Sequence, residues 1–264
     1  KKYQRDTTII HFVAPTVWAW RASRAKKFAK VYNEIFTLFS FENKFFEKHN
    51  LKSTCIGHPI YYINNNSNLV KTKNNVAFLP GSRMGEIKSL FIYYQLAYEQ
   101  LMKINSKLQI FIPTLPHLRN EIIERTKKWK MDTVIIMDNK QMESYFLKTK
   151  IALVCSGTAS LEIAKRGIPQ LVIYKLNYFT ELIARFFIRI KFANILNILE
   201  NKMIIPEITN SKLKKNIFIK QFNNLLIDEK SNSQQIEKVN KAISKIDLLK
   251  PPFEIAVEGI KKFL

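Results

Sequence analysis

Residues 76–86 read Val-Ala-Phe-Leu-Pro-Gly-Ser-Arg-Met-Gly-Glu. The stretch begins as an apolar run of strand length, breaks at Pro80-Gly81 and continues into a helical pattern. Gly81 permits a tight turn, Ser82 can cap the helix, and Arg83 presents a guanidinium where an anion would sit. In an open α/β sheet, ligands bind at the carboxyl ends of the strands, and a helix amino terminus favours phosphate. The stretch therefore predicts an α/β fold in which Ser82 and Arg83 are candidate phosphate contacts.

The rest of the chain repeats this alternation of strand and helix. Strand-like runs are expected at 7–13, 76–79, 108–112, 133–137, 151–155 and 170–174. Helical patterns are expected at 86–102, 117–128, 142–148 and 158–166, and a last helix at 253–263. Strands that alternate with helices in this way form parallel sheets.

A second strand-to-helix loop follows Cys155. Ser156, Gly157 and Thr158 expose backbone donors and hydroxyls at the start of a helix, and Glu162 lies one turn further along, where a carboxylate could accept ribose hydroxyls. Either loop alone is equally an ordinary capped turn, but two in one chain favour a nucleotide site. Neither loop matches the P-loop or the dinucleotide fingerprint, so adenine cofactors are not favoured.

The composition predicts a globular protein. With 264 residues and 47% hydrophobic content, the chain has material for one large domain, or one domain with part of another. Its two cysteines, Cys55 and Cys155, supply neither metal-ligand spacing nor a disulfide framework, which fits a reducing compartment. No clustered metal ligands are found in the sequence, so no metal is expected.

The net charge of +22 calls for an anionic partner or surface. Lys and Arg are denser at 21–30, 125–130 and 212–220. A summed positive field attracts anionic lipids or nucleic acid. The sequence has no RNA-binding aromatic signature, zinc finger or clear helix-turn-helix, which counts against nucleic acid.

The segment 176–192 bears on the membrane hypothesis. It combines bulky apolar residues with Arg185, Arg189 and Lys191, the mixture expected of a helix lying in a membrane interface. A helix packed on its own domain explains the pattern equally well, because periodicity does not say what an apolar face packs against. No stretch approaches the ~20 uninterrupted apolar residues that a membrane span requires.

Aromatic and polar residues in unusual places give further candidates. Trp18 and Trp20 lie two positions apart, after Ala14-Pro15, and form either a hydrophobic plug or a rigid wall beside a cleft. Asn197 and Glu207 are polar groups within apolar runs, and each needs a partner if it is buried. Helix capping and ligand contact are both open for this pair.

Seven motifs, taken in order and spacing, resemble one enzyme family. They are Ala14 to Arg21, Gly57-His58-Pro59, Leu79 to Glu86, Ser156 to Glu162, Val172 to Lys175, Asn197 to Leu199, and Ile205-Pro206-Glu207. Together they look like lipid-A-disaccharide synthase, from about Thr7 to the carboxyl terminus. Other two-domain sugar-nucleotide transferases share the architecture but not the tryptophan pair with this series.

The resemblance implies a GT-B glycosyltransferase fold, with a truncated first Rossmann-like domain and a complete second one. Residues 1–70 would be the remainder of the acceptor-side domain and a linker through the Asn-rich tract at 64–75. Residues 71–250 would be the nucleotide-sugar-binding domain, and 251–264 a carboxyl-terminal helix that packs back on the first domain. Because the chain opens with Lys1 close to the first strand, it is expected to begin partway through this fold.

The resemblance also implies a reaction. Enzymes of this family join UDP-2,3-diacylglucosamine to 2,3-diacylglucosamine 1-phosphate, with inversion and release of UDP, on the inner face of the bacterial inner membrane. Arg83 with the turn 156–158 would hold the diphosphate, Glu162 the ribose, and Asn197 and Glu207 the donor side of the cleft. Ser82, Trp18 and Trp20 complete the implied substrate-binding set, and no cofactor is implied. The expected partners are the UDP-sugar donor, the acylated acceptor and an anionic membrane surface, but no nucleic acid.

Departures from the family pattern limit these expectations. The glycine-rich strand-turn and acidic segment expected upstream, with the catalytic carboxylate, are missing, so the general base is unknown. Ile60 stands near where the family commonly has Asp, and Asn210 where it has Gln. We therefore expect UDP binding without transferase activity, unless a separate amino-terminal piece is supplied. Three rivals remain: another UDP-sugar enzyme such as an N-acetylglucosaminyl transferase or epimerase, a silent membrane-associated remnant, and a basic nucleic-acid-binding protein.

Overall fold

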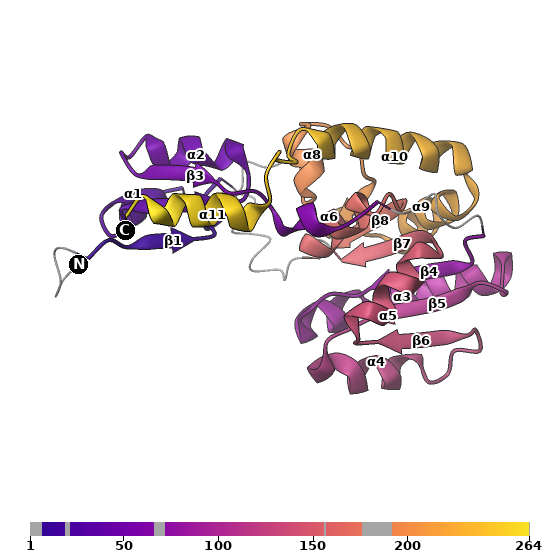
Figure 1. The fold of residues 1–264 in the computed structure, drawn as a ribbon. Coiled ribbons are helices and arrows are strands. Elements are labelled where there is room, and N and C mark those ends of the chain that lie inside the picture. Colours follow the sequence, from indigo (N-terminus) through magenta and orange to yellow (C-terminus); the bar gives the residue numbers. More distant parts are fainter. Residues whose placement is uncertain (1–6, 19–21, 66–71, 156, 176–191, 264) are drawn as a thin grey trace. The chain divides into compact units, whose positions relative to one another are not determined.

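A computed structural model describes residues 7–18, 22–65, 72–155, 157–175 and 192–263. These residues form two units (Figure 1). Of the described residues, unit 1 contains 7–18, 22–63 and 244–263, and unit 2 contains the remainder. The amphipathic segment 176–192 lies, except for Phe192, outside the described residues, so its predicted helix has no structural account.

Unit 1 is built on a parallel sheet of three strands in the order β1-β2-β3. Its first elements are β1 (Ile10–Phe12), α1 (Arg24–Ala29), β2 (Glu34–Thr37), α2 (Ser40–Glu47), β3 (Lys52–Cys55) and a 3₁₀ turn, η1 (Pro59–Tyr62). Neighbouring side chains of β2 point to opposite faces. Ile35 packs with Ala25 of α1 and Phe46 of α2, because right-handed crossovers bring both helices to the same face.

The carboxyl-terminal helix α11 (Pro252–Lys261) covers the other face of this sheet. Phe36, the neighbour of Ile35 on β2, packs there against Ala256 of α11. A Cβ added to Gly259 would lie only 2.6 Å from Phe36 Cζ. The helix therefore approaches the sheet closely, and Gly259 is what allows it.

Unit 2 contains a parallel sheet of six strands in the order β6-β5-β4-β7-β8-β9. The strands are β4 (Asn75–Leu79), β5 (Gln109–Pro113), β6 (Thr133–Ile136), β7 (Thr149–Cys155), β8 (Gln170–Tyr174) and β9 (Glu207–Thr209). The chain winds outward from β4 through β5 to β6, then returns to β7 on the other side of β4. This is the doubly wound order, with a topological switch point between β4 and β7.

Helices cover both faces of this sheet. They are α3 (Met84–Ile104), α4 (Arg119–Thr126), α5 (Asn139–Leu147), α6 (Thr158–Lys165), α8 (Ile195–Leu199), α9 (Lys215–Ile227) and α10 (Glu229–Ser244), with 3₁₀ turns η2 (Pro116–Leu118) and η3 (Asn210–Lys212). Val76 and Phe78 of β4 point into the core formed with α3, α4 and α9, whereas Ala77 points into the core formed with α5 and α6. The predicted α/β class with parallel sheets is confirmed.

Several observed boundaries of helices and strands differ from the predicted ones for identifiable reasons. The strand expected at 7–13 begins only at Ile10 and ends at Phe12, where Val13 with φ +68° leaves the strand region. Helix α5 starts before the expected Met142, because Asp138 caps it by accepting from Gln141 N at 2.8 Å. The helix expected at 117–128 is divided into η2 and α4.

Candidate functional site

The two predicted loops lie side by side in unit 2. One follows β4 and the other follows β7, and these two strands are paired along their length, from Asn75 with Thr149 to Leu79 with Val154. Both loops therefore leave the carboxyl edge of the sheet at its switch point, where open α/β sheets bind ligands. This placement is the strongest geometric argument for a site here.

The first loop presents Arg83 to solvent. Gly81 has φ +111°, and a Cβ at this position would collide with the side chain of Glu86, so the turn requires glycine. The Arg83 side chain is 81% exposed, and its Nη1 lies 3.3 Å from Glu86 Oε1. Most of the guanidinium donors of Arg83 thus remain directed outward.

Glu86 already occupies the amino terminus of α3. Its Oε2 accepts from the main-chain N–H groups of Ser82 at 3.0 Å and Arg83 at 3.2 Å, which is the carboxylate half of a capping box. Two of the backbone donors expected to attract phosphate are therefore satisfied within the loop. The side chains of Arg83 and Ser82 are exposed here.

Buried groups beneath this loop are held neutral. Burial, followed by the nearby Glu86 carboxylate, raises the pKa of the Cys155 thiol to about 12. Burial likewise raises the pKa of Tyr94, whose hydroxyl donates to the Leu79 carbonyl at 2.7 Å.

The second loop follows β7 and ends where α6 begins. Gly157 has φ +145°, and a Cβ there would meet nothing within 4 Å, so the space beside the helix start is open. Thr158 begins α6, and Ser156 lies outside the described residues. Glu162 lies one turn along α6 with its side chain 46% exposed. Burial raises its pKa, against the lowering effect of Arg166.

Asn197 and Glu207 are joined by direct hydrogen bonds. Asn197 is fully buried, and its Nδ2 donates to Ile205 O at 2.8 Å and to Glu207 Oε2 at 3.2 Å. Its Oδ1 accepts from the main-chain N–H groups of Ile204 and Ile205. The amide of Asn197 thus holds the turn between α8 and β9, and of this pair only Glu207 is partly exposed.

Trp18 is half-buried in unit 1, with its ring edge-on to Phe41 at a centroid distance of 5.3 Å, and Trp20 lies outside the described residues. Trp18 Nε1 donates to Glu42 Oε1 at 2.9 Å, and Glu42 Oε2 accepts from the N–H groups of Leu38 and Phe39. Burial raises the pKa of Glu42, which is 3% exposed. Sequence reasoning missed Glu42, although a carboxylate inside an aromatic run is the same signal that singled out Glu207.

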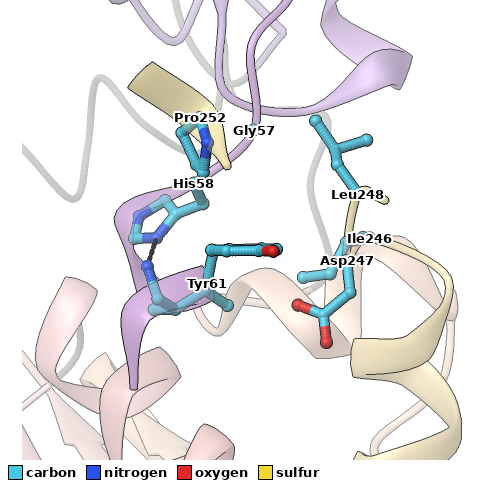
Figure 2. Close-up of a pocket in the computed structure, with 8 residues that line it drawn as sticks. Gly57, His58, Tyr61, Ile246, Asp247, Leu248 and Pro252 are labelled. Carbon is cyan, nitrogen blue, oxygen red and sulfur yellow. Dashed lines mark hydrogen bonds between the residues drawn. The ribbon is translucent and has the colours of Figure 1, made fainter. Parts of the chain in front are cut away.

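His58 belongs to a narrow hollow in unit 1, lined by Gly57, Ile60, Tyr61, residues 246–248 and Pro252 (Figure 2). Its Nδ1 accepts from Ile60 N at 3.1 Å, and its ring stacks on Phe39 with the centroids 5.5 Å apart. Burial lowers the pKa of His58 to about 4. The bond from Ile60 N places His58 as a structural cap of η1.

Clustered metal ligands and membrane-spanning helices are both absent from the described part of the chain. Within the ranges given above, the structure contains no group of three or more His, Cys, Asp or Glu side chains suited to hold a metal ion. None of its described helices is both long and apolar enough to cross a membrane.

Comparison with solved structures identifies the architecture. MurG of Acinetobacter baumannii gives a TM-score of 0.56 at 11% identity, with 96% of this chain and 66% of that chain covered. Staphylococcus aureus MnaA, solved with UDP, gives 0.54 at 12% identity, with 80% and 56% covered. Likeness at such low identity shows the fold alone, and the fold is the GT-B glycosyltransferase fold predicted from the sequence.

Sequence comparison is more specific. The lipid-A-disaccharide synthase of Rickettsia bellii is 32% identical over 250 residues, which cover 91% of this chain and 65% of the relative. That of Rhodospirillum centenum is 28% identical over 241 residues, with 88% and 60% covered. The chain thus spans just under two thirds of the length of these relatives. Because the sequence model described as lipid-A-disaccharide synthetase matches residues 1–251, nearly the whole chain, the protein belongs to the lipid-A-disaccharide synthetase family.

Proposed function

We propose that this chain carries the nucleotide-sugar-binding part of a lipid-A-disaccharide synthase. The reaction is transfer of the 2,3-diacylglucosaminyl group from its UDP derivative to 2,3-diacylglucosamine 1-phosphate. The acceptor 6-hydroxyl oxygen attacks C1 of the donor sugar, the bond from C1 to the diphosphate breaks, and UDP leaves. The hydroxyl proton passes to a general base, and we assign none of the described residues to this role.

The juxtaposition of the loops after β4 and β7 carries this proposal. A diphosphate between them would meet the exposed guanidinium of Arg83 on one side and the start of α6, with Gly157 and Thr158, on the other. A cation and a helix amino terminus both stabilise the negative charge that develops on departing UDP. Glu162, one turn along α6, would accept the ribose hydroxyls, and Glu207 would face the donor sugar while Asn197 holds it.

Binding of UDP to the intact chain tests this assignment. Arg83→Ala removes charge-assisted hydrogen bonds, each worth roughly 1.5–3 kcal/mol, so calorimetry should show UDP affinity reduced about tenfold or more. Uridine lacks the diphosphate, and its affinity should be unchanged. Lys220→Ala, an exposed cation in the middle of α9, is the matched control and should leave both affinities as they were. Equal losses for UDP and uridine would contradict the diphosphate role of Arg83.

The choice of sugar donor separates this reaction from its rivals. When the chain is combined with a separate amino-terminal piece, product formed from the acylated donor and acceptor, but not from UDP-N-acetylglucosamine, supports disaccharide synthesis. Turnover of UDP-N-acetylglucosamine instead supports an N-acetylglucosaminyl transferase or an epimerase. Salt-dependent binding to duplex DNA or RNA without UDP binding supports a nucleic-acid-binding protein.

We further propose that the protein works at an anionic membrane surface, as a peripheral protein on the inner face of the bacterial inner membrane. The helices α1 and α2 of unit 1 share one face of their sheet. Together with the residues that cap their carboxyl ends, they carry six exposed cations, Arg24, Lys26, Lys27, Lys30, Lys44 and Lys48. We call these residues the basic helix face. Glu42 is buried, so among the described residues of α1 and α2 one acid, Glu47, is exposed against these six cations. The face is therefore strongly cationic and suits acidic lipid headgroups.

A further inference from the structure

A continuous set of hydrogen bonds runs through the interior of unit 2, from the first turn of α6 to the start of β9. At its centre is Asn194, which is 2% exposed. Asn194 Nδ2 donates to Ser160 Oγ at 2.5 Å, and its main-chain N–H donates to Glu207 Oε2 at 2.8 Å. Its Oδ1 accepts from Leu196 N at 2.9 Å and so caps α8. One buried residue thus joins α6, α8 and β9.

Each end of this connection is fixed by further bonds. Ser160 is 1% exposed and lies two positions after Thr158. Its Oγ donates to Gln170 Oε1 at 2.8 Å, so the lone pairs of the Ser160 hydroxyl face Asn194. At the other end, Glu207 Oε1 accepts from Ala193 N at 2.9 Å. Because every member has its partners, the set behaves as a rigid brace rather than as separate contacts.

We infer that Asn194 is a positioning residue for the nucleotide-sugar site. It fixes the spacing between the turn at Gly157-Thr158 and the carboxylate of Glu207, the groups that would hold the diphosphate and the donor sugar. Buried as it is, Asn194 acts through these groups and does not touch the ligand. The inference rests on the proposed function, because it takes both groups to face one UDP-sugar.

Gln235 of α10 provides a matched comparison in the same polar interior. It is 6% exposed, its Oε1 accepts from Gln170 N at 2.8 Å, and its Nε2 donates to Gln170 O at 3.1 Å. Neither bond reaches α6 or Glu207. Gln235→Ala and Asn194→Ala therefore remove comparable buried hydrogen bonds, but only the second breaks the connection between the two ligand-binding groups.

The test measures thermal unfolding and UDP affinity of the intact chain for both variants. Each variant should lower Tm, because each leaves buried polar groups without a partner. Only Asn194→Ala should weaken UDP binding, by about three- to tenfold, since small displacements of binding groups are costly. Ser160→Ala, which cuts the same bond from the other side, should weaken UDP binding similarly and without additivity in the double variant.

The outcomes distinguish this inference from the proposed function. If Asn194→Ala and Gln235→Ala change UDP affinity equally, or if Asn194→Ala and Ser160→Ala leave it unchanged, the positioning role is wrong. If the unmodified chain does not bind UDP at all, the proposed function itself is wrong and the inference falls with it.

Discussion

His58 shows at the scale of one residue how burial decides a role. Its pKa of about 4 in the folded protein lies below the ordinary value of 6.5, so the unfolded chain binds more protons between these values. Stability from this residue is therefore present above pH 6.5 and lost as pH falls toward 4. His58→Asn keeps a side-chain acceptor for Ile60 N but removes the titration. On going from pH 7 to pH 5, the free energy of unfolding of the variant should rise relative to that of the unmodified chain by on the order of 1 kcal/mol. This figure allows for solvent screening of a partly exposed ring.

Urea unfolding of both proteins at the two pH values checks this prediction. The relevant quantity is the difference between variant and unmodified chain, because the other titrating groups contribute equally to both. An unchanged difference between pH 7 and pH 5 would show that His58 is solvated and titrates normally.

Single residues also mark the limit of what the sequence could predict. The apolar surroundings of Asn197 and Glu207 indicated correctly that each needs a partner, but the two alternatives, capping and ligand contact, could not be separated. Glu42, a carboxylate within an aromatic run, carries the same signal. Its partner Trp18 is 24 positions away in the chain, and only the folded sheet brings them together. Sequence pattern predicts the need for a partner, whereas the tertiary fold decides which partner meets it.

At the scale of elements, the contact of α11 with its sheet depends on Gly259. Replacing a helical glycine by alanine ordinarily stabilises a helix by roughly 0.5–1 kcal/mol. Here the added Cβ would lie 2.6 Å from the buried Phe36 ring, and overpacking of this kind costs about 1–3 kcal/mol. Gly259→Ala should therefore lower the free energy of unfolding. Gly85→Ala, in the first turn of α3 with nothing within 4 Å, is the control and should be neutral or slightly stabilising. Equal effects on urea unfolding would contradict close packing of α11.

The elements that the sequence predicted are the ones with long apolar runs. The central strands β4, β7 and β8 were expected within two residues of their observed bounds. Strands β2, β3 and β9 were not expected, because polar residues leave each of them with an apolar run of at most two residues, as in Lys-Ser-Thr-Cys of β3. Such short strands are stabilised by their neighbours in the sheet rather than by their own pattern.

At the scale of the whole molecule, the effect of net charge on membrane binding can be separated from the effect of where the charge lies. Charge reversal of Lys26, Lys27, Lys44 and Lys48 to Glu changes the net charge from +22 to +14, since each substitution removes two units. Reversal of Lys215, Lys220, Lys230 and Lys238, exposed on α9 and α10 of unit 2, gives the same +14. Any difference between the two variants therefore reports where the charge lies.

Vesicles that contain phosphatidylglycerol provide the measurement. The unmodified chain should bind them, more weakly as salt rises, because exposed charges are screened. Each lysine near an anionic surface is worth about 1 kcal/mol, so reversal of the four lysines on the basic helix face should reduce binding at least about tenfold. The variant with reversed lysines in unit 2 should lose clearly less of its vesicle binding. Both variants should still bind UDP if their reversed charges lie away from the loops after β4 and β7. Equal losses would mean that total charge, and not the basic helix face, governs membrane binding, whereas absence of binding by the unmodified chain would remove the membrane from the proposed function.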